Sequence, residues 1–127
     1  MNIREITDSV VIAKKLVGDW NKEHCIGIYC NANQDVKHVE VITIGLLDST
    51  LIHPREVFKP ALLNNATHVI ILHNHPSNNV MPSKPDKRMM KLLESAGRIM
   101  GIEVYDQIVF CNTGSFYSLR EKRKCEL

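Results

Sequence analysis

The sequence lacks several features that would mark it for a particular cellular role. It has no apolar run approaching the length of a membrane-spanning helix, no secretory signal, no internal repeat and no low-complexity segment. Its formal net charge of +2 is too small to indicate a nucleic-acid partner by itself. These absences argue against a membrane or secreted protein and predict a soluble, cytoplasmic one.

Cysteine pairing is also absent. The four cysteines show neither a Cys-x-x-Cys pair nor the regular spacing of a disulfide framework, so we expect free thiols in a reducing compartment. Cys25 and Cys30 lie in an apolar segment, where a free cysteine usually behaves as a small core residue. We therefore expect no disulfide bonds.

The composition fits one globular domain. The 127 residues are 44% hydrophobic and 24% charged, ordinary values for a soluble fold with one compact core. No stretch reads as a linker, so residues 1–127 are predicted to form a single domain.

Apolar periodicity predicts helices that alternate with strands. The predicted helices are residues 7–20, residues 54–64, and one that starts at Ser83 and ends near Gly97 or Gly101. The predicted strands are residues 24–32 and 36–46 as a hairpin, a brief piece at 51–52 after a turn at 48–50, and residues 67–72, 102–110 and 116–119. Together they predict an α/β or α+β fold, with a mixed sheet flanked by helices. The basic run at Arg120, Lys122, Arg123 and Lys124 is expected to be a solvated tail.

Two histidines follow the most apolar of these strands. Residues 67–72 are nearly all β-branched or apolar, which is typical of a central strand covered on both faces, and His73 and His75 come directly after them. Because side chains alternate along an extended chain, two histidines one residue apart point to the same side and can bind one metal ion. Pro76 predicts a loop, so the pair lies at a strand end, where sites are commonly built.

A carboxylate lies on the buried side of the helix that follows. An apolar stripe recurs there at helical spacing: Met89, Met90, Leu93, Ala96 and Met100. Asp86 precedes Leu93 by seven residues, about two helical turns, so it faces the same buried side. A buried carboxylate is costly unless it is paired, capped or bound to a metal. Asp86 is therefore a third candidate ligand beside the histidine pair.

Ser83 and Asp86 also have an ordinary structural explanation. The Ser-x-x-Asp spacing is a variant of the capping box found at many helix starts, and taken alone it favours a helix cap over a catalytic role. The neighbouring histidine pair shifts the balance towards a site. Ser83 can both cap the helix and contribute to catalysis.

Three protein ligands would leave the fourth position of a zinc ion to water, which distinguishes a catalytic zinc site from a structural one. Hydrolysis would also need a carboxylate to take a proton from that water. The candidates are Glu23, Glu40 and Glu56. Glu40 lies on an alternating hairpin arm, and Glu56 lies in a first helical turn, where the helix dipole favours an acid. The residues alone favour Glu23, at the start of a buried strand, only slightly.

The order of these residues resembles a known motif. His73-x-His75, followed after seven residues by Ser83-x-x-Asp86 and preceded by a glutamate that leads into an apolar strand, is similar to the JAMM motif of MPN+ metalloproteases. More narrowly, the chain resembles the RadC group of bacterial JAMM domains in further segments: His53-Pro54-Arg55-Glu56-Val57-Phe58, His73-Asn74-His75-Pro76-Ser77, and Gly101-Ile102-Glu103-Val104 followed by Asp106. The similarity spans about residues 23–112 and is specific, because several independent segments agree in order and spacing.

The resemblance implies a cytidine-deaminase-like JAB/MPN sandwich with Zn²⁺ on His73, His75 and Asp86. It also implies that Glu23 is the general acid and base, and that Ser83 donates to the oxyanion of a tetrahedral intermediate. Related members cleave peptide or isopeptide bonds, so a peptide or isopeptide is the expected substrate.

An alternative function also follows from the resemblance. The RadC name implies a factor in DNA repair or recombination that binds nucleic acid or repair proteins without cutting. Phosphate groups would then be contacted by basic side chains of the third helix, namely Lys84, Lys87, Arg88 and Lys91, and by those of the tail. Two other functions are disfavoured. In the nuclease family named after His-Asn-His, the three residues are not adjacent in the sequence, so the adjacent His73-Asn74-His75 does not indicate such a nuclease. A cytidine deaminase is disfavoured because the sequence has no Pro-Cys-x-x-Cys ligand pair.

The chain departs from the usual RadC pattern in three respects. Asn78 stands where members usually have glycine, and asparagine tolerates a left-handed conformation better than most residues. Gln107 stands where a histidine usually follows the late aspartate, which puts any hydrogen bond to a metal ligand from that position in doubt. The helix-hairpin-helix region that precedes this domain in longer members is not expected in this sequence.

Overall fold

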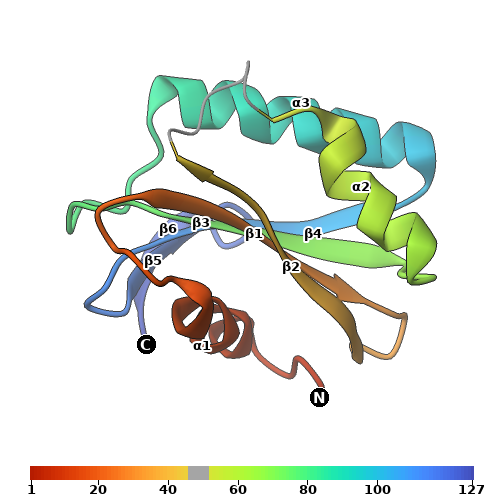
Figure 1. Cartoon of the computed structure of the whole chain (residues 1–127), viewed down its shortest axis with the longest axis horizontal. Coiled ribbons are helices and arrows are strands. Elements are labelled where there is room, and N and C mark those ends of the chain that lie inside the picture. The colour runs from red at the N-terminus through yellow and green to blue at the C-terminus, as the bar shows by residue number, and fades with distance from the viewer. Residues whose placement is uncertain (46–51) are drawn as a thin grey trace.

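A computed structural model describes residues 1–45 and 52–127 of the chain. The elements in order are α1 (Ile6–Leu16), β1 (Glu23–Cys30), β2 (Val36–Gly45), α2 (Pro54–Leu63), β3 (His68–Asn74), α3 (Lys84–Met100), β4 (Glu103–Phe110), β5 (Ser115–Ser118) and β6 (Arg123–Glu126). The strands form one six-stranded sheet in the order β2-β1-β3-β4-β5-β6. The predicted sandwich, a mixed sheet flanked by helices, is confirmed (Figure 1).

The pairing of the strands explains why the sheet is mixed. β1 pairs antiparallel with β2 and β3, and β4–β5 and β5–β6 are also antiparallel, whereas β3 and β4 are parallel. Parallel neighbours need a long crossover connection, and α3 supplies it. The end of β3 and the start of α3 are therefore joined by a single loop at one end of the sheet.

The helices cover both faces of the sheet (Figure 1). α1 packs on one face over an apolar cluster that includes Val10, Ala13, Ile28, Ile70, Leu72, Ile108 and Phe110. α2 and α3 pack on the other face over a second cluster that includes Val57, Phe58, Val69, Ile71, Met89 and Leu93. None of the helices in the described part of the chain is long and apolar enough to cross a membrane.

β3 is the central strand that the sequence predicts, and all seven of its residues are buried. Its side chains alternate between the two cores, because Ile70 and Leu72 belong to the α1 cluster whereas Val69 and Ile71 belong to the α2–α3 cluster. By the same alternation, the side chain of His73 lies on the α3 face and that of Asn74 on the α1 face.

The third helix begins and ends at clear signals. Ser83 is its N-cap, and Gly101 ends it in a left-handed conformation with φ of 73°, so Gly101 and not Gly97 marks its C-terminus. Gly97 lies inside the helix, where it lets α3 approach the start of β4. A Cβ atom at this position would lie 2.6 Å from the carbonyl oxygen of Ile102.

The first helix is shorter than predicted. It ends at Leu16 and not at Trp20, because Val17 already has an extended conformation and Gly18 follows it. Trp20 continues the apolar pattern of this helix without being part of it. Its ring packs edge-to-face on Phe110 with centroids 5.9 Å apart, so it contributes to the core from a loop.

The predicted solvated tail is wrong in part, because residues 123–126 form the edge strand β6. Arg-Lys-Cys-Glu carries no alternating apolar pattern, and Cys125 is its only residue that packs on the α1 cluster. The strand is held mainly by its ladder with β5 and by hydrogen bonds that the Ser115 hydroxyl makes with the Glu126 carboxylate, at 2.7 and 2.9 Å. The predicted turn at 48–50 and residue 51 lie outside the described residues, and Ile52 is buried but belongs to no strand.

Candidate metal centre

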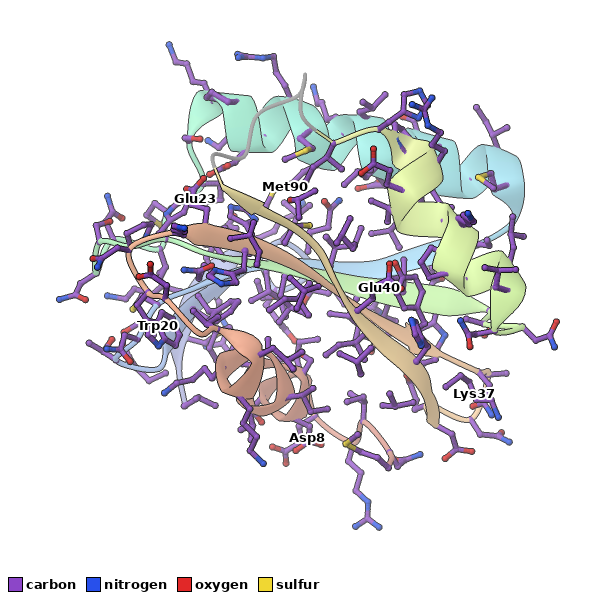
Figure 2. All side chains as sticks on the ribbon, viewed as in Figure 1. Asp8, Trp20, Glu23, Lys37, Glu40 and Met90 are labelled. Atoms are coloured by element: carbon purple, nitrogen blue, oxygen red, sulfur yellow. The ribbon has the colours of Figure 1, made fainter. Side chains whose placement is uncertain are left out.

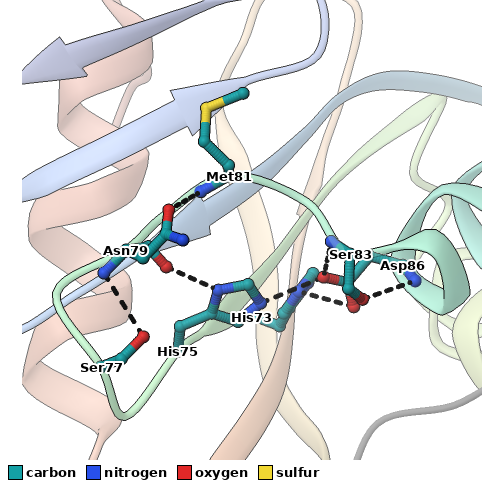
Figure 3. Close-up of polar contacts among 7 residues, drawn as sticks. All are labelled: His73, His75, Ser77, Asn79, Met81, Ser83 and Asp86. Carbon is teal, nitrogen blue, oxygen red and sulfur yellow. Dashed lines mark hydrogen bonds and ion pairs between the residues drawn. The ribbon is translucent and has the colours of Figure 1, made fainter.

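Three predicted ligands meet where β3 gives way to α3. His73 is near the end of β3, His75 follows the strand, and Asp86 lies in the first turn of α3. Their ligand atoms all lie within 4.8 Å of one another. The Nε2 atoms of His73 and His75 lie 3.3 Å and 3.0 Å from the two carboxylate oxygens of Asp86. Figure 3 draws both contacts as dashed lines.

The loop after β3 fixes the ring of His75. Its Nδ1 lies 2.8 Å from the carbonyl oxygen of Asn79, which can only accept a hydrogen bond, so Nδ1 carries the hydrogen and Nε2 is directed at Asp86. Asn79 is itself held by two hydrogen bonds, from its N–H to the Ser77 hydroxyl and from the Met81 N–H to its side chain (Figure 3). In the neutral ring this arrangement leaves Nε2 free to bind a metal.

Asp86 is nearly inaccessible to solvent, with 3% of its surface exposed. Its backbone N–H donates to the hydroxyl of Ser83 at 3.1 Å, and the N–H of Ser83 donates to its carboxylate at 2.8 Å, so the predicted capping box is present. Burial alone raises the pKa of Asp86, but its contacts with His73, His75 and Ser83 outweigh burial and hold the pKa well below the usual range. The carboxylate is therefore ionised and available as a ligand.

His75 carries the opposite shift. Burial lowers its pKa, whereas the hydrogen bonds to Asp86 and to the Asn79 carbonyl, together with the negative charges of Asp86 and Glu23, raise it above its ordinary value overall. The environment thus favours positive charge at this point of the cluster. The same negative charges would also stabilise a bound cation.

These residues fit a zinc ion. The Nε2 of His73 is buried and has no hydrogen-bond partner of good geometry within the described residues, although it faces Asp86. A buried imidazole nitrogen without a partner is costly, and a metal ion would satisfy it. Two imidazoles and one carboxylate are a donor set that zinc accepts in catalytic sites.

Glu23 is the predicted base that lies nearest to the cluster. It is the first residue of β1, and Figure 2 shows it at the end of the sheet where α3 begins. Its negative charge helps to raise the pKa of His75. Glu40 lies on β2, where it is 2.8 Å from His38, and Glu56 is exposed in the first turn of α2. Of the three glutamates that the sequence offers as candidate bases, Glu23 is therefore the one whose charge acts on the cluster.

One residue of the site was missed from the sequence. Asn74 stands between the two histidines, is fully buried, and faces away from them. Its side-chain oxygen accepts from the N–H of His24 at 2.6 Å, and its amide nitrogen donates to the carbonyl of Lys22 at 2.9 Å. These two residues flank Glu23, so Asn74 ties the segment that carries Glu23 to the segment that carries the histidines. An amide next to an otherwise apolar strand is the sequence signal that could have revealed it.

The two substitutions relative to the usual RadC pattern have simple structural outcomes. Asn78 is not among the positive-φ residues, which apart from glycine are Gln34, Asn65 and Lys122 in the described chain, so its loop has no need of glycine. Gln107 is buried and donates from Nε2 to the carbonyl of Met90 at 2.9 Å. It therefore fastens β4 to the middle of α3 and makes no hydrogen bond to the ligands.

Two hollows are lined by residues that are close to the cluster in the sequence or by Glu23. One, of about 400 Å³, is lined by Glu23 and its neighbours: Asn21, Lys22, Ile44, Gly45 and Pro76. The other, of about 720 Å³, follows α3 away from the cluster and begins at Pro82 and Lys87, which are sequence neighbours of Ser83 and Asp86. Space for a ligand therefore exists on both the Glu23 side and the Ser83 side of the cluster.

Comparison with known proteins identifies the family of the chain. Residues 3–124 match the sequence model of a family described as the RadC-like JAB domain. Relatives include a UPF0758 protein of Bacillus cereus (strain 03BB102), 46% identical over 95% of this chain and 53% of its own length. Another is a UPF0758 protein of Chlorobium chlorochromatii (strain CaD3), 41% identical over 84% of this chain and 47% of its own length. The chain spans about half the length of these relatives.

Proposed function

Because the chain belongs to the RadC-like JAB domain family, we propose that it is a zinc-dependent hydrolase that cleaves peptide or isopeptide bonds. The observation that carries this proposal is the buried cluster of His73, His75 and Asp86, whose ligand atoms lie within 4.8 Å of one another. When bound there, zinc supplies Lewis acidity that polarises a carbonyl and makes water a stronger acid.

The proton transfers are assigned to Glu23. Its carboxylate would accept a proton from the attacking water and pass it to the nitrogen of the leaving amine, so one group acts first as base and then as acid. Its place at the mouth of β1, beside the smaller hollow, supports this role. Asn74 would hold the backbone on either side of it, at Lys22 and His24.

Ser83 is assigned the stabilisation of negative charge. One lone pair of its hydroxyl oxygen accepts the N–H of Asp86, and the hydroxyl proton can still be donated. It would donate that proton to the carbonyl oxygen that becomes an oxyanion during attack. Helix capping and catalysis therefore use different parts of the same hydroxyl group.

The proposal is tested by metal content and amide hydrolysis measured on the same preparations. We expect wild type and Glu23→Gln to carry about one equivalent of zinc, and Asp86→Asn to carry little, because Asp86 is one of the three proposed ligands whereas Glu23 is not a ligand. Hydrolysis of a quenched fluorogenic peptide library and of a lysine isopeptide should fall by roughly 10² to 10⁴ in Glu23→Gln, the usual contribution of a general base.

Glu40→Gln is the matched control, because Glu40 is a half-exposed glutamate of the neighbouring strand. It should keep both zinc and activity. A folded wild-type protein that binds no zinc would overturn the proposal, and so would a Glu23→Gln variant as active as wild type.

A second proposal, binding of DNA or repair proteins without cleavage, has narrower support. Of the basic residues expected to contact phosphate, Lys87 and Lys91 line the larger hollow, whereas Lys84 and Arg88 are exposed elsewhere on α3. Arg120 and Lys122 line the same hollow. The predicted set is thus divided between two surfaces, which weakens the case for one continuous phosphate-binding face.

We also propose that the protein acts in the cytoplasm. All four cysteines are free, and three of them are buried. Unpaired buried thiols are typical of proteins from reducing compartments.

A further inference from the structure

The groove beside α3 has a higher net positive charge than the chain as a whole. It has a volume of about 720 Å³ and is lined mainly by α3, β4, β5 and the segment after β5. Its charged residues are five basic and two acidic side chains: Lys87, Lys91, Arg98, Arg120 and Lys122, with Glu94 and Asp106. The lining has a net charge of +3 on this count, whereas the whole chain has +2. The rest of the chain then has a net charge of −1 on the same count, so the lining is enriched in positive charge.

The two carboxylates in the lining are already engaged. Glu94 pairs with Arg98 at 3.1 Å on the same helix. Asp106 is 3% exposed and accepts hydrogen bonds from the Ser118 hydroxyl and from the N–H groups of Gln107 and Arg120. Three exposed cations, Lys87, Lys91 and Lys122, form no ion pair with any carboxylate of the described chain. They remain available to a negatively charged ligand.

Much of the uncharged lining is apolar. Met90, Val104, Tyr117 and Leu119 contribute to it. Figure 2 places Met90 beneath α3, on the side that faces the sheet. Apolar surface among unpaired cations suits a ligand that carries both carboxylates and apolar side chains. From Lys87 to Arg98 the helix rises about 16 Å, which corresponds to about five residues of extended peptide.

The aromatic side chains favour a peptide over single-stranded nucleic acid. Binding of single strands usually relies on exposed aromatic faces that stack on bases. One face of Tyr105 is covered by the guanidinium of Arg120, 4.1 Å from the ring centroid, and the ring of His68 packs against Tyr105 at 5.6 Å. Tyr117 packs on the buried cluster of Val80, Met90, Val109 and Cys111. Neither tyrosine offers a free stacking platform.

We propose that this groove binds an acidic, extended segment of the polypeptide substrate, about five residues long. Its carboxylates contact Lys87, Lys91 and Lys122, and its apolar side chains contact the floor. The inference rests on the proposed hydrolysis in one respect: the bound segment is taken to belong to the substrate because one end of the groove is lined by Pro82 and Lys87, the sequence neighbours of Ser83 and Asp86.

Binding can be tested separately from cleavage. The full chain carrying Glu23→Gln is titrated into a fluorescein-labelled peptide of about eight residues, longer than the groove, that alternates glutamate and leucine. Fluorescence anisotropy reports binding. The pair Lys87→Gln/Lys91→Gln should weaken binding about tenfold, since each lost surface contact contributes a few-fold. The matched control is Lys14→Gln/Lys15→Gln on α1, on the opposite face of the sheet, and it should bind as the parent does.

Several results would overturn the proposal. These are absence of binding at low salt, equal weakening by the α1 control, and equal binding of a peptide with lysine in place of glutamate. Tighter binding of a single-stranded oligonucleotide, lost in the groove variant, would assign the groove to nucleic acid instead. Failure of the zinc and hydrolysis experiments would leave these binding results unaffected, so the two proposals fail separately.

Discussion

At the scale of single residues, the candidate centre depends on groups that are not ligands. The Asn79 carbonyl orients His75, the Ser83 backbone orients Asp86, and Asn74 holds the backbone on either side of Glu23. Ligands held by such outer contacts keep their geometry without a metal. Of these supports, Asn74 is the most deeply buried, and its contacts join positions 50 and 52 residues apart in the sequence.

We expect Asn74→Ala to lower the free energy of unfolding by about 2 kcal/mol. The variant loses two hydrogen bonds and leaves the buried N–H of His24 without its acceptor. Urea denaturation measures the loss. Asn112→Ala, at an exposed position, is the control and should stay within about 0.5 kcal/mol of wild type. Equal stability of the two variants would contradict the role assigned to Asn74.

The ligands could be predicted from the sequence, whereas their supports could not. His-x-His and Ser-x-x-Asp are local patterns, whose geometry follows from the periods of a strand and a helix. The role of Asn74 depends on the pairing of β1 with β3, which no local pattern contains. The choice of Glu23 over Glu40 and Glu56 likewise needed either the family resemblance or the structure.

At the scale of elements, α3 is the part that connects the site to the rest of the fold. Its first turn supplies Asp86, its buried stripe enters the α2–α3 core, and Gln107 of β4 donates to its Met90 carbonyl. Near its end, Gly97 lies against the backbone at Ile102. The position of Asp86 therefore depends on packing along the whole helix.

Gly97→Ala should destabilise the protein by about 1 to 3 kcal/mol, even though alanine favours a helix over glycine by about 1 kcal/mol. The new Cβ would lie 2.6 Å from the Ile102 carbonyl oxygen and 3.1 Å from Val104, so α3 must move away from β4. Thermal and urea unfolding measure the change. Ser95→Ala, exposed on the same helix, should be neutral or slightly stabilising. A more stable Gly97→Ala variant would show that the close approach is unimportant.

The helices and central strands could be predicted because their apolar residues recur at one period. The exceptions have physical causes. Trp20 extended the apolar period of the first helix but packs on Phe110 from a loop, and β6 is held by pairing and side-chain hydrogen bonds, with little apolar burial. In both segments, contacts between residues far apart in the sequence determine the structure, and the local apolar pattern does not.

At the scale of the whole molecule, the sheet is covered on both faces and its cores enclose most of the thiols. Cys30 lies in the α1 cluster, Cys25 in the α2–α3 cluster, and Cys111 in a third cluster near Val80. Burial raises the pKa of Cys25 to about 12 and that of Cys30 to about 11. Cys125 is the only cysteine that is partly exposed.

Alkylation of the native protein should therefore be selective. Iodoacetamide at about pH 8 reacts with exposed thiolates, so we expect it to label Cys125 well before the other three cysteines. Mass spectrometry of proteolytic fragments measures the order of labelling, and the same reaction in denaturant should label all four. Labelling of Cys25 or Cys30 as fast as Cys125 would contradict the packing described for the two cores.

The close spacing of the ligands along the chain has a consequence for the denatured state. His75 and Asp86 are 11 positions apart, whereas His24 and Asn74 are 50 apart. In the unfolded chain, the entropic cost of bringing His75 and Asp86 together is about 1 kcal/mol smaller than that of bringing His24 and Asn74 together, because this free-energy cost grows with the logarithm of loop length. The denatured chain therefore keeps some affinity for a metal ion, and zinc will raise the melting temperature by less than its affinity for the native site alone implies.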